Sequence, residues 1–524
     1  MKRAIIFSMA TTMAICGCGQ SNSNRDGSSI AGGAGGTANA GGTTSSGGTS
    51  DAGATSDAGP VCNASIPVNA GNTCDIESPP DAGAPPDAGS ASDLTKVGPY
   101  AVGHVSYMLS DTTVYARPVA VSVWYPVDSA TVTSVTPPAQ YPFDPYSDNL
   151  PVSTSTDWEA VGYDRAYEGP TPSGDGPFPL VMVSPGSGCD YWQYLYIGTR
   201  LASHGYVVAV TEHENEGQWP WSPTDGIVVQ MFNRTGDVSF VITELLLKND
   251  AKGELLAGTI DPSRIAMSGH SLGGYTTYAL AGGVDEVCDT LWPASMKLES
   301  LPYPQYTCAP ANPDPRIRAM VSLDGSSQFL HYEELARLSI PSLIMGETVE
   351  HTVSYNSQSL LASDSDIGRW IARPHAAIHR TDSYRVDVTI ADHMSFAIFC
   401  DLYTVMGRLG VANYGQYVNT SEYPCVVQGT FDPKNNPATR EIVTTYMLAF
   451  LNTYLGREDD SLMLTSSYAS QYQPNVEFFD SEACSECQVG QGDYAYRPHP
   501  CQCSVAQQDP SDYFAPPGSD GGAP

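Results

Sequence analysis

The sequence predicts an α/β fold, with a mostly parallel central sheet and helices on both of its faces, over residues 96–458. Short apolar runs in this range alternate with longer segments whose apolar residues recur at helical spacing, and that alternation is typical of such a sheet. Hydrophobic residues make up 41% of the chain, which is enough for a large buried core. The composition changes sharply before residue 96 and after residue 458, and these changes set the predicted limits.

The predicted elements follow one another along that range. Residues 119–125 alternate apolar and polar before Pro126, as in an outer strand. Residues 180–183 form a continuous apolar run, which predicts a central strand covered on both faces. The other predicted strands are residues 205–210, 264–267, 319–323, 342–345 and 385–390, and the predicted helices are residues 194–203, 237–247, 275–281 and 439–455.

The N-terminus, residues 1–18, predicts a lipoprotein-type signal peptide. A short basic start precedes an apolar run that is too short to span a bilayer. Gly17 before Cys18, with Ile15 further back, resembles the bacterial lipobox, although Cys16 stands where Ala or Ser is usual. We expect an exported chain in the cell envelope, lipid-anchored to the outer membrane at Cys18, or else ordinary cleavage and secretion.

Two further segments flank the predicted α/β domain. Residues 19–95 consist mostly of Gly, Ala, Ser, Asp and Pro, with a recurring Asp-Ala-Gly triplet. This composition buries too little apolar surface to offset chain entropy, so it predicts a disordered tether. Residues 459–524 predict a Cys-containing C-terminal extension.

The charge balance limits the partners. The chain has 24 Lys and Arg against 57 Asp and Glu, a formal net charge of −33. Such a surface repels nucleic acid phosphates and anionic lipid head groups. We therefore expect no nucleic acid partner, and membrane contact only through the lipid at Cys18. The oligomeric state stays open.

The chain contains 13 cysteines, a number that suits an oxidising compartment. Once Cys16 and Cys18 are set aside, eleven remain, and Cys189 is the one left over from the local pairs. A zinc site in the tail, completed by His499, is the alternative to tail disulfides. The expected pairs are Cys62 with Cys74, Cys288 with Cys308 and Cys400 with Cys425, and the expected tail cluster is Cys484, Cys487, Cys501 and Cys503.

Ser271 is the candidate nucleophile, in the segment Gly269-His270-Ser271-Leu272-Gly273-Gly274. A Gly-x-Ser-x-Gly pattern is weak alone in a chain with 49 glycines. Here it lies between a predicted strand and a predicted helix, which is the strand–turn–helix setting that a nucleophile turn requires. The serine hydroxyl becomes nucleophilic when a histidine takes its proton.

The histidine is expected late in the chain, because this arrangement orders its triad as Ser, acid, His. His393 directly follows the predicted strand 385–390 and is the candidate. His351, His375 and His379 lie in loop or Pro-broken stretches and are the weaker alternatives.

Two positions compete for the acid that orients the histidine. Asp324 directly follows the predicted strand 319–323 and is the sharper signal. Glu347 or Glu350 follows the next strand, and Glu350 is the main rival.

The oxyanion of the reaction needs two backbone N–H donors. One is Leu272, the residue after the nucleophile. The other is expected from the glycine-rich loop 184–188, where Ser187 is the candidate.

Five segments of the chain together carry a family resemblance. The segments 97–100, 119–126, 179–186, 202–208 and 269–274 resemble the platelet-activating-factor acetylhydrolase-like branch of the α/β-hydrolases. The resemblance implies an α/β-hydrolase fold and ester hydrolysis with no metal and no cofactor. It favours Asp324 as the acid, whereas the related cutinase and dienelactone hydrolase branches place the acid near Glu350. The chain departs from the pattern at Pro185, where histidine is common, and in a Cys-bearing insertion, residues 284–313.

The sequence therefore predicts a serine carboxylic ester hydrolase that forms an acyl-enzyme on Ser271. Two alternatives stay open: a cutinase-like polyester hydrolase, and a catalytically inactive hydrolase-fold binding protein on the cell surface. Four aromatic residues near the predicted site have two interpretations: they line a groove for an acyl chain or polymer, or they belong to the protein core. They are Tyr191, Trp192, Trp219 and Trp221.

Overall fold

A computed structural model describes the chain between residues 93 and 480. The predicted signal peptide, most of the tether, residues 481–524, Trp219 and Trp221 lie outside the described residues. So do the side chains of all the cysteines that are expected to pair, of which only the Cys400 backbone is described. The internal segments that are not described are 112–116, 144–150, 188, 214–225, 283–312, 328–329, 331, 348–372, 379, 392, 411–425, 428–429, 432–435 and 457–458.

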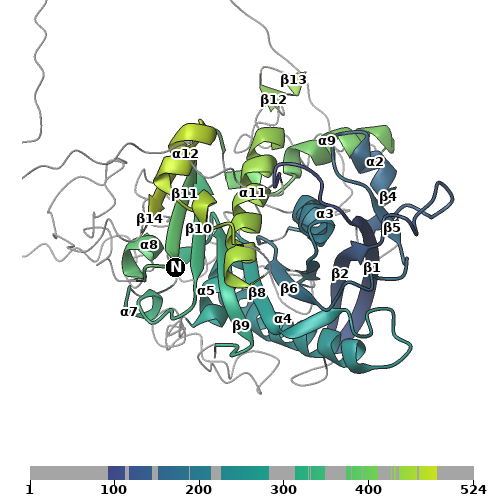
Figure 1. Cartoon of the computed structure of the whole chain (residues 1–524), viewed down its shortest axis with the longest axis horizontal. Coiled ribbons are helices and arrows are strands. Elements are labelled where there is room, and N and C mark those ends of the chain that lie inside the picture. Colours follow the sequence, from purple (N-terminus) through teal and green to yellow (C-terminus); the bar gives the residue numbers. More distant parts are fainter. Residues whose placement is uncertain are drawn as a thin grey trace, which may run out of the picture. The chain divides into compact units, whose positions relative to one another are not determined.

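One large sheet of ten strands organises the described chain (Figure 1). Its order is β14-β11-β10-β9-β8-β6-β7-β2-β1-β5. The strands are β1 (Ala101–Asp111), β2 (Arg117–Val127), β5 (Ala166–Glu168), β6 (Phe178–Ser184), β7 (Val207–Glu212), β8 (Ile260–His270), β9 (Ile317–Leu323), β10 (Ser342–Glu347), β11 (Ser383–Val388) and β14 (Val476–Asp480). Two small separate pairs are β3 (Gln140–Pro142) with β4 (Val152–Thr154), and β12 (Val426–Val427) with β13 (Thr430–Phe431).

The centre of the sheet is parallel, from β7 through β6, β8, β9 and β10 to β11. Every residue of β6 is buried, because helices cover both faces of the central strands. The predicted strand 119–125 is β2, but it lies between β7 and β1 rather than at the edge, since β1 and β5 extend the sheet beyond it. The prediction of a mostly parallel α/β sheet is confirmed.

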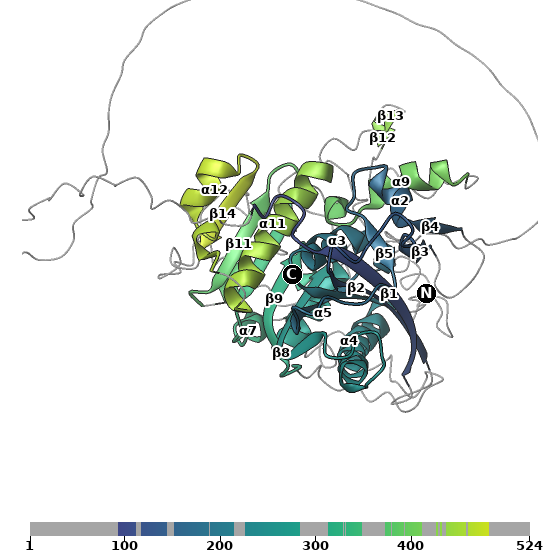
Figure 2. The same ribbon diagram turned by 45° about the vertical axis from the view of Figure 1, so that its right-hand side comes forward.

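Helices cover both faces of this sheet (Figures 1 and 2). On one face, α3 (Leu195–Ser203) and α11 (Asn436–Tyr454) enclose a core that includes Val181 and Val183. On the other, α4 (Gly226–Asp250) packs on Leu180 and Met182. The alternation along β6 follows from the two-residue repeat of a strand. The remaining helical elements are α2 (Ser155–Glu159), η2 (Tyr191–Tyr194), α5 (Leu272–Ala281), α7 (Tyr332–Leu335), α8 (Arg373–Ala377), η6 (His393–Phe396), α9 (Phe399–Arg408), η7 (Ser461–Met463) and α12 (Ser466–Tyr472).

The predicted domain boundary at residue 458 falls too early. Residues 461–480 form η7, α12 and β14, and β14 pairs antiparallel with β11 from Val388 and Val476 to Tyr384 and Asp480. Phe478 is buried in the same core cluster as the central strands. The start of the predicted extension is therefore part of the central sheet, because a short apolar strand covers the edge that β11 would otherwise expose.

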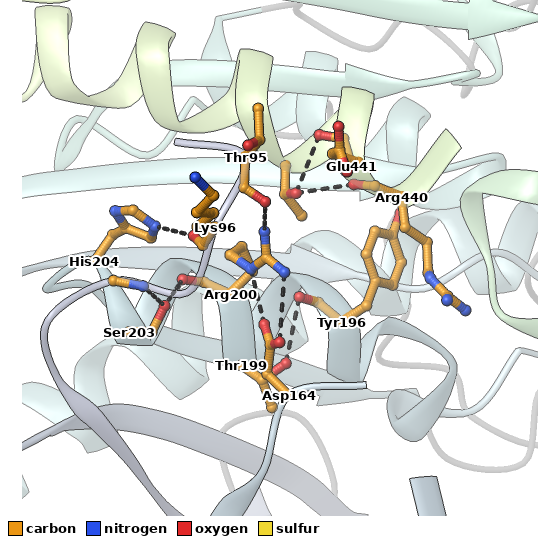
Figure 3. A network of polar contacts seen from close by, with 12 residues as sticks. Thr95, Lys96, Asp164, Tyr196, Thr199, Arg200, Ser203, His204, Arg440 and Glu441 are labelled. Atoms are coloured by element: carbon orange, nitrogen blue, oxygen red, sulfur yellow. Dashed lines mark hydrogen bonds and ion pairs between the residues drawn. The ribbon is translucent and has the colours of Figure 1, made fainter. Parts of the chain in front are cut away.

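The segment that leads into β1 is fastened along α3 (Figure 3). Arg200 donates to the Thr95 carbonyl at 2.7 Å and pairs with Asp164 through Nε at 2.8 Å. His204 Nε2 lies 2.8 Å from the Lys96 carbonyl. A Cβ at Gly98 would lie 2.1 Å from the Ser203 carbonyl oxygen, so this close approach requires glycine.

Candidate active site

Ser271 occupies a strained turn between β8 and α5. Its φ of 55° and ψ of −121° lie outside the regions that L-residues ordinarily adopt. A strained backbone conformation persists only where the surrounding structure imposes it, and such conformations are frequent at functional sites. The turn is held by the Ser271 N–H, which donates to the Leu323 carbonyl at 3.1 Å, and by its carbonyl, which accepts from the Ser326 N–H at 2.8 Å.

Two glycines make the turn sterically feasible. A Cβ at Gly269 would lie 2.1 Å from the Gly273 carbonyl oxygen, and a Cβ at Gly273 would lie 1.9 Å from the Ser184 carbonyl oxygen. Both distances are far below van der Waals contact, and in each case the obstacle is backbone. The spacing of the motif is therefore a packing requirement between β8, α5 and β6.

Asp324 directly follows β9 and is 2% exposed. Its φ is 43°, and among the residues that the structure describes it shares a positive φ only with Ser271 and with glycines. Its N–H donates to the Met345 carbonyl at 2.7 Å. The two strained non-glycine residues thus stand at the ends of neighbouring strands, β8 and β9.

His393 lies between these two residues. It begins η6 after β11 and is 9% exposed. Its Nδ1 is 2.5 Å from Asp324 Oδ2, and its Nε2 is 3.0 Å from Ser271 Oγ. The carboxylate can only accept, so Nδ1 carries the proton and Nε2 faces the serine hydroxyl as an acceptor. The structure brings together the serine, histidine and aspartate that the sequence singles out.

The rival positions are placed differently or are not described. Glu347 ends β10 and is buried. His375 lies on α8, and burial lowers its pKa to about 3, with the nearby Arg385 charge as the next cause. Glu350, His351 and His379 lie outside the described residues.

The candidate oxyanion donors flank Ser271. Leu272 is the first residue of α5, and N–H groups in the first turn of a helix have no acceptor within the helix. Ser187 lies in the loop that follows β6. That loop passes directly beside Ser271, because a Cβ at Gly186 would lie 3.2 Å from Ser271 Cβ.

Arg234 holds this loop from behind and is a residue that the sequence analysis missed. It comes from α4 and is 1% exposed. Its guanidinium donates to the carbonyls of Pro185 at 2.5 Å and Gly186 at 2.9 Å. The sequence signal for it is its spacing: Arg234 falls in line with the apolar residues Val238 and Val241 on one face of the helix.

Two more histidines are tied into the site from positions that the motif analysis left aside. His270 precedes the nucleophile and is fully buried, and its ring centroid is 4.7 Å from that of His393. His213 follows β7, and its Nε2 lies 2.8 Å from Ser184 Oγ while its Nδ1 lies 2.9 Å from Asp237 Oδ2. His213 thus holds the start of the same loop to α4.

The structure decides two other expectations, those for Cys189 and for the buried aromatic residues. Cys189 is disulfide-bonded and is therefore not the cysteine left over, although its partner lies outside the described side chains. Tyr191 and Trp192 are 2% and 0% exposed and belong to the core rather than to an open groove. The described residues contain no group of three or more His, Cys, Asp or Glu side chains that could hold a metal ion, and none of their helices is long and apolar enough to cross a membrane.

One family model matches part of the chain. Residues 91–219 match the family model of platelet-activating factor acetylhydrolase, isoform II. The chain has an α/β-hydrolase-like fold, with a large, mostly parallel central sheet and helices on both of its faces (Figure 1).

Two other comparisons add context to this fold. Among solved structures it is similar to a ferulic acid esterase from Streptomyces cinnamoneus, with 20% sequence identity, coverage of 75% of this chain and 98% of that chain, and a TM-score of 0.44. No curated protein matches the sequence. The family match ends before Ser271, Asp324 and His393, so their roles are argued from geometry.

Proposed function

We propose that this protein is a serine ester hydrolase that works through an acyl-enzyme on Ser271. The observation that carries the proposal is the position of His393, within hydrogen-bond distance of both the Ser271 hydroxyl and the Asp324 carboxylate. A nucleophile, a base that contacts it and an acid that orients the base are the parts that acyl transfer requires.

The proposed reaction begins with attack of Ser271 Oγ on the ester carbonyl carbon. His393 Nε2 takes the hydroxyl proton as the bond forms, and the Asp324 carboxylate stabilises the imidazolium. The N–H groups of Leu272 and Ser187 are the proposed donors to the oxyanion. The tetrahedral intermediate then expels the alcohol, which receives its proton from His393, and leaves an acyl group on Ser271.

Water completes the cycle. His393 removes a proton from the water as it attacks the acyl carbonyl carbon, and the second tetrahedral intermediate releases the carboxylic acid. The proton on His393 returns to Ser271 Oγ. The reaction uses only groups of the chain and consumes one ester and one water.

A fluorophosphonate probe tests the proposal, because it phosphonylates an activated serine. We expect labelling of the wild type and turnover of short p-nitrophenyl esters, with both lost in Ser271→Ala. Labelling that persists in Ser271→Ala would refute the assignment of the nucleophile. A wild type that is neither labelled nor active would instead favour the binding-protein alternative.

We also propose export with lipidation at Cys18, supported by the basic start, the apolar run and the Gly17-Cys18 pair. Growth with radiolabelled palmitate in a bacterial host tests this. We expect label in the wild type and not in Cys18→Ser. Equal labelling of the two would contradict it.

A further inference from the structure

A continuous row of buried hydrogen bonds runs behind Ser271 and joins the two loops that flank it. The Gly186 N–H donates to the Tyr194 hydroxyl at 2.9 Å. That hydroxyl lies 2.8 Å from His270 Nδ1, and His270 Nε2 lies 2.8 Å from the His393 carbonyl oxygen. Tyr194 and His270 are both 0% exposed. The row therefore begins in the proposed oxyanion loop and ends on the backbone of the proposed general base.

The two ends of the row determine the direction of every bond in it. A backbone N–H can only donate and a carbonyl oxygen can only accept. Because the His393 carbonyl accepts, His270 Nε2 must carry a proton. In the neutral imidazole Nδ1 is then an acceptor, so the Tyr194 hydroxyl donates to it while accepting from Gly186.

The protonation states that this direction requires agree with the surroundings. Burial holds the pKa of His270 well below its usual value, and the neighbouring His393 lowers it further. Burial also raises the pKa of the Tyr194 hydroxyl, so it keeps its proton. A neutral His270 and an intact hydroxyl leave one consistent arrangement of protons.

The oxyanion loop is held from both sides. Tyr194 engages the N–H of Gly186, which is therefore not an oxyanion donor. Arg234 engages the carbonyls of Pro185 and Gly186. Since the N–H of a trans peptide points opposite its carbonyl, fixing the Gly186 carbonyl also fixes the direction of the Ser187 N–H.

The other end of the row fixes the backbone from which the His393 imidazole projects. The neighbouring Phe396 carbonyl accepts a hydrogen bond from the Tyr196 hydroxyl at 2.8 Å, and the Ile398 N–H donates to the Gln193 carbonyl at 3.1 Å. The His393 loop is thus held at three positions: at the first by His270 of β8, and at the other two by residues of α3 and η2. Of these bonds, only the one through His270 also reaches the oxyanion loop.

We infer that Tyr194 and His270 are positioning residues, which set the oxyanion loop and the general base in one fixed relation to Ser271. The inference rests on the function proposed above. Neither side chain touches the reacting atoms, so both act through Gly186 and His393. Their loss is expected to impair transition-state stabilisation and proton transfer rather than substrate binding.

The kinetic test compares Tyr194→Phe with Tyr446→Phe. Tyr446 on α11 is equally buried, and its hydroxyl has no hydrogen-bond partner in the described part of the chain, so it is a matched control. We expect Tyr194→Phe to lower kcat on a p-nitrophenyl ester by about tenfold or more, with KM changed by less than about twofold. We expect Tyr446→Phe to match the wild type.

Two further readouts separate positioning from general damage. A thionoester gains less from oxyanion donors, so Tyr194→Phe should slow it less than the matched oxygen ester. His270→Gln combined with Tyr194→Phe should be no worse than the more severe single variant, because both break one row, whereas His270→Gln and Tyr446→Phe should combine additively.

The protonation pattern can be tested without any variant. Nitrogen NMR of the labelled wild type should show His270 as the neutral Nε2–H tautomer from pH 5 to pH 8. A charged His270, or the Nδ1–H tautomer, would overturn the inference, and so would equal kinetics for Tyr194→Phe and Tyr446→Phe. Fluorophosphonate labelling of the wild type separates the two claims. If the wild type is labelled but the kinetic or NMR results differ from those expected, only the positioning roles of Tyr194 and His270 are refuted. If the wild type is not labelled, the proposed function is refuted as well.

Discussion

Replacement of Arg234 by methionine should separate loop positioning from folding. The side chain is 1% exposed and makes hydrogen bonds to the carbonyls of Pro185 and Gly186. A hydrogen bond to a charged group contributes roughly 1.5–3 kcal/mol. The Gly186 carbonyl keeps a second donor, the Cys189 N–H at 3.2 Å, whereas the donor to the Pro185 carbonyl is lost. We therefore expect a total cost of about 3 kcal/mol, near the lower end of two such bonds.

That cost can appear in either of two measurements. If the loop keeps its place, the free energy of unfolding in urea falls by about 3 kcal/mol. If the loop relaxes, the rate of fluorophosphonate labelling falls by up to about 100-fold, since each 1.36 kcal/mol corresponds to tenfold. Arg234→Lys has one charged nitrogen in place of the two that reach the carbonyls, and should recover about half of the loss.

Arg200→Met is the matched control for this experiment. Arg200 also makes hydrogen bonds to a carbonyl and a carboxylate, but it lies on α3 at the segment that leads into β1. It should lower the free energy of unfolding and leave the labelling rate of the folded protein unchanged. The reasoning is refuted if Arg234→Met has the stability and the labelling rate of the wild type, or if Arg200→Met slows labelling as much.

Three further predictions address the acid, a helix and the pH dependence. Asp324→Asn should lower kcat by about 10³-fold or more, because the amide would favour the wrong tautomer of His393, whereas Glu350→Gln should retain most activity; equal losses would leave the acid unassigned to Asp324. Gly236→Ala should stabilise the fold by roughly 0.5–1 kcal/mol, because Gly236 is exposed within α4 and a Cβ there meets nothing within 4 Å; a lower melting temperature would contradict this. Burial lowers the pKa of His375 from the usual 6.5 to about 3, so below pH 6.5 the unfolded chain binds a proton that the folded chain does not. The stability that neutral His375 contributes is full above pH 6.5 and is lost as the pH falls toward 3. His375→Gln should therefore show a smaller loss of unfolding free energy between pH 7 and pH 5, and an unchanged loss would exclude His375 as a cause.

The central strands and the residues of the nucleophile turn could be predicted because local sequence determines them. The apolar run at 180–183 is β6, and the motif at Ser271 needs glycines for contacts with adjacent backbone. Asp324 and His393 were found from their positions directly after strands. The chain order of a parallel sheet brings such positions to one edge, so spacing alone carries information about them.

Contacts between distant segments could not be predicted in the same way. Arg234 lies 48 positions from the Gly186 carbonyl that it holds, and His270 lies 123 positions from the His393 carbonyl. No periodicity encodes such pairs, because hydrogen-bond partners are chosen by the packed fold. β14 was missed because its five residues lie in a Tyr-rich and Gln-rich segment, and its partner β11 determines that they form a strand.

The hydrogen bonds between residues 95–100 and the end of α3 protect the central sheet from force applied to the chain before them. A pull on that chain would have to break the contacts of Arg200, His204 and Ser203 before any tension reached β1. A protease cut upstream of Asp93 would remove none of them. Tension applied at Asp93, or a cut before it, would therefore leave the geometry around Ser271 unaltered.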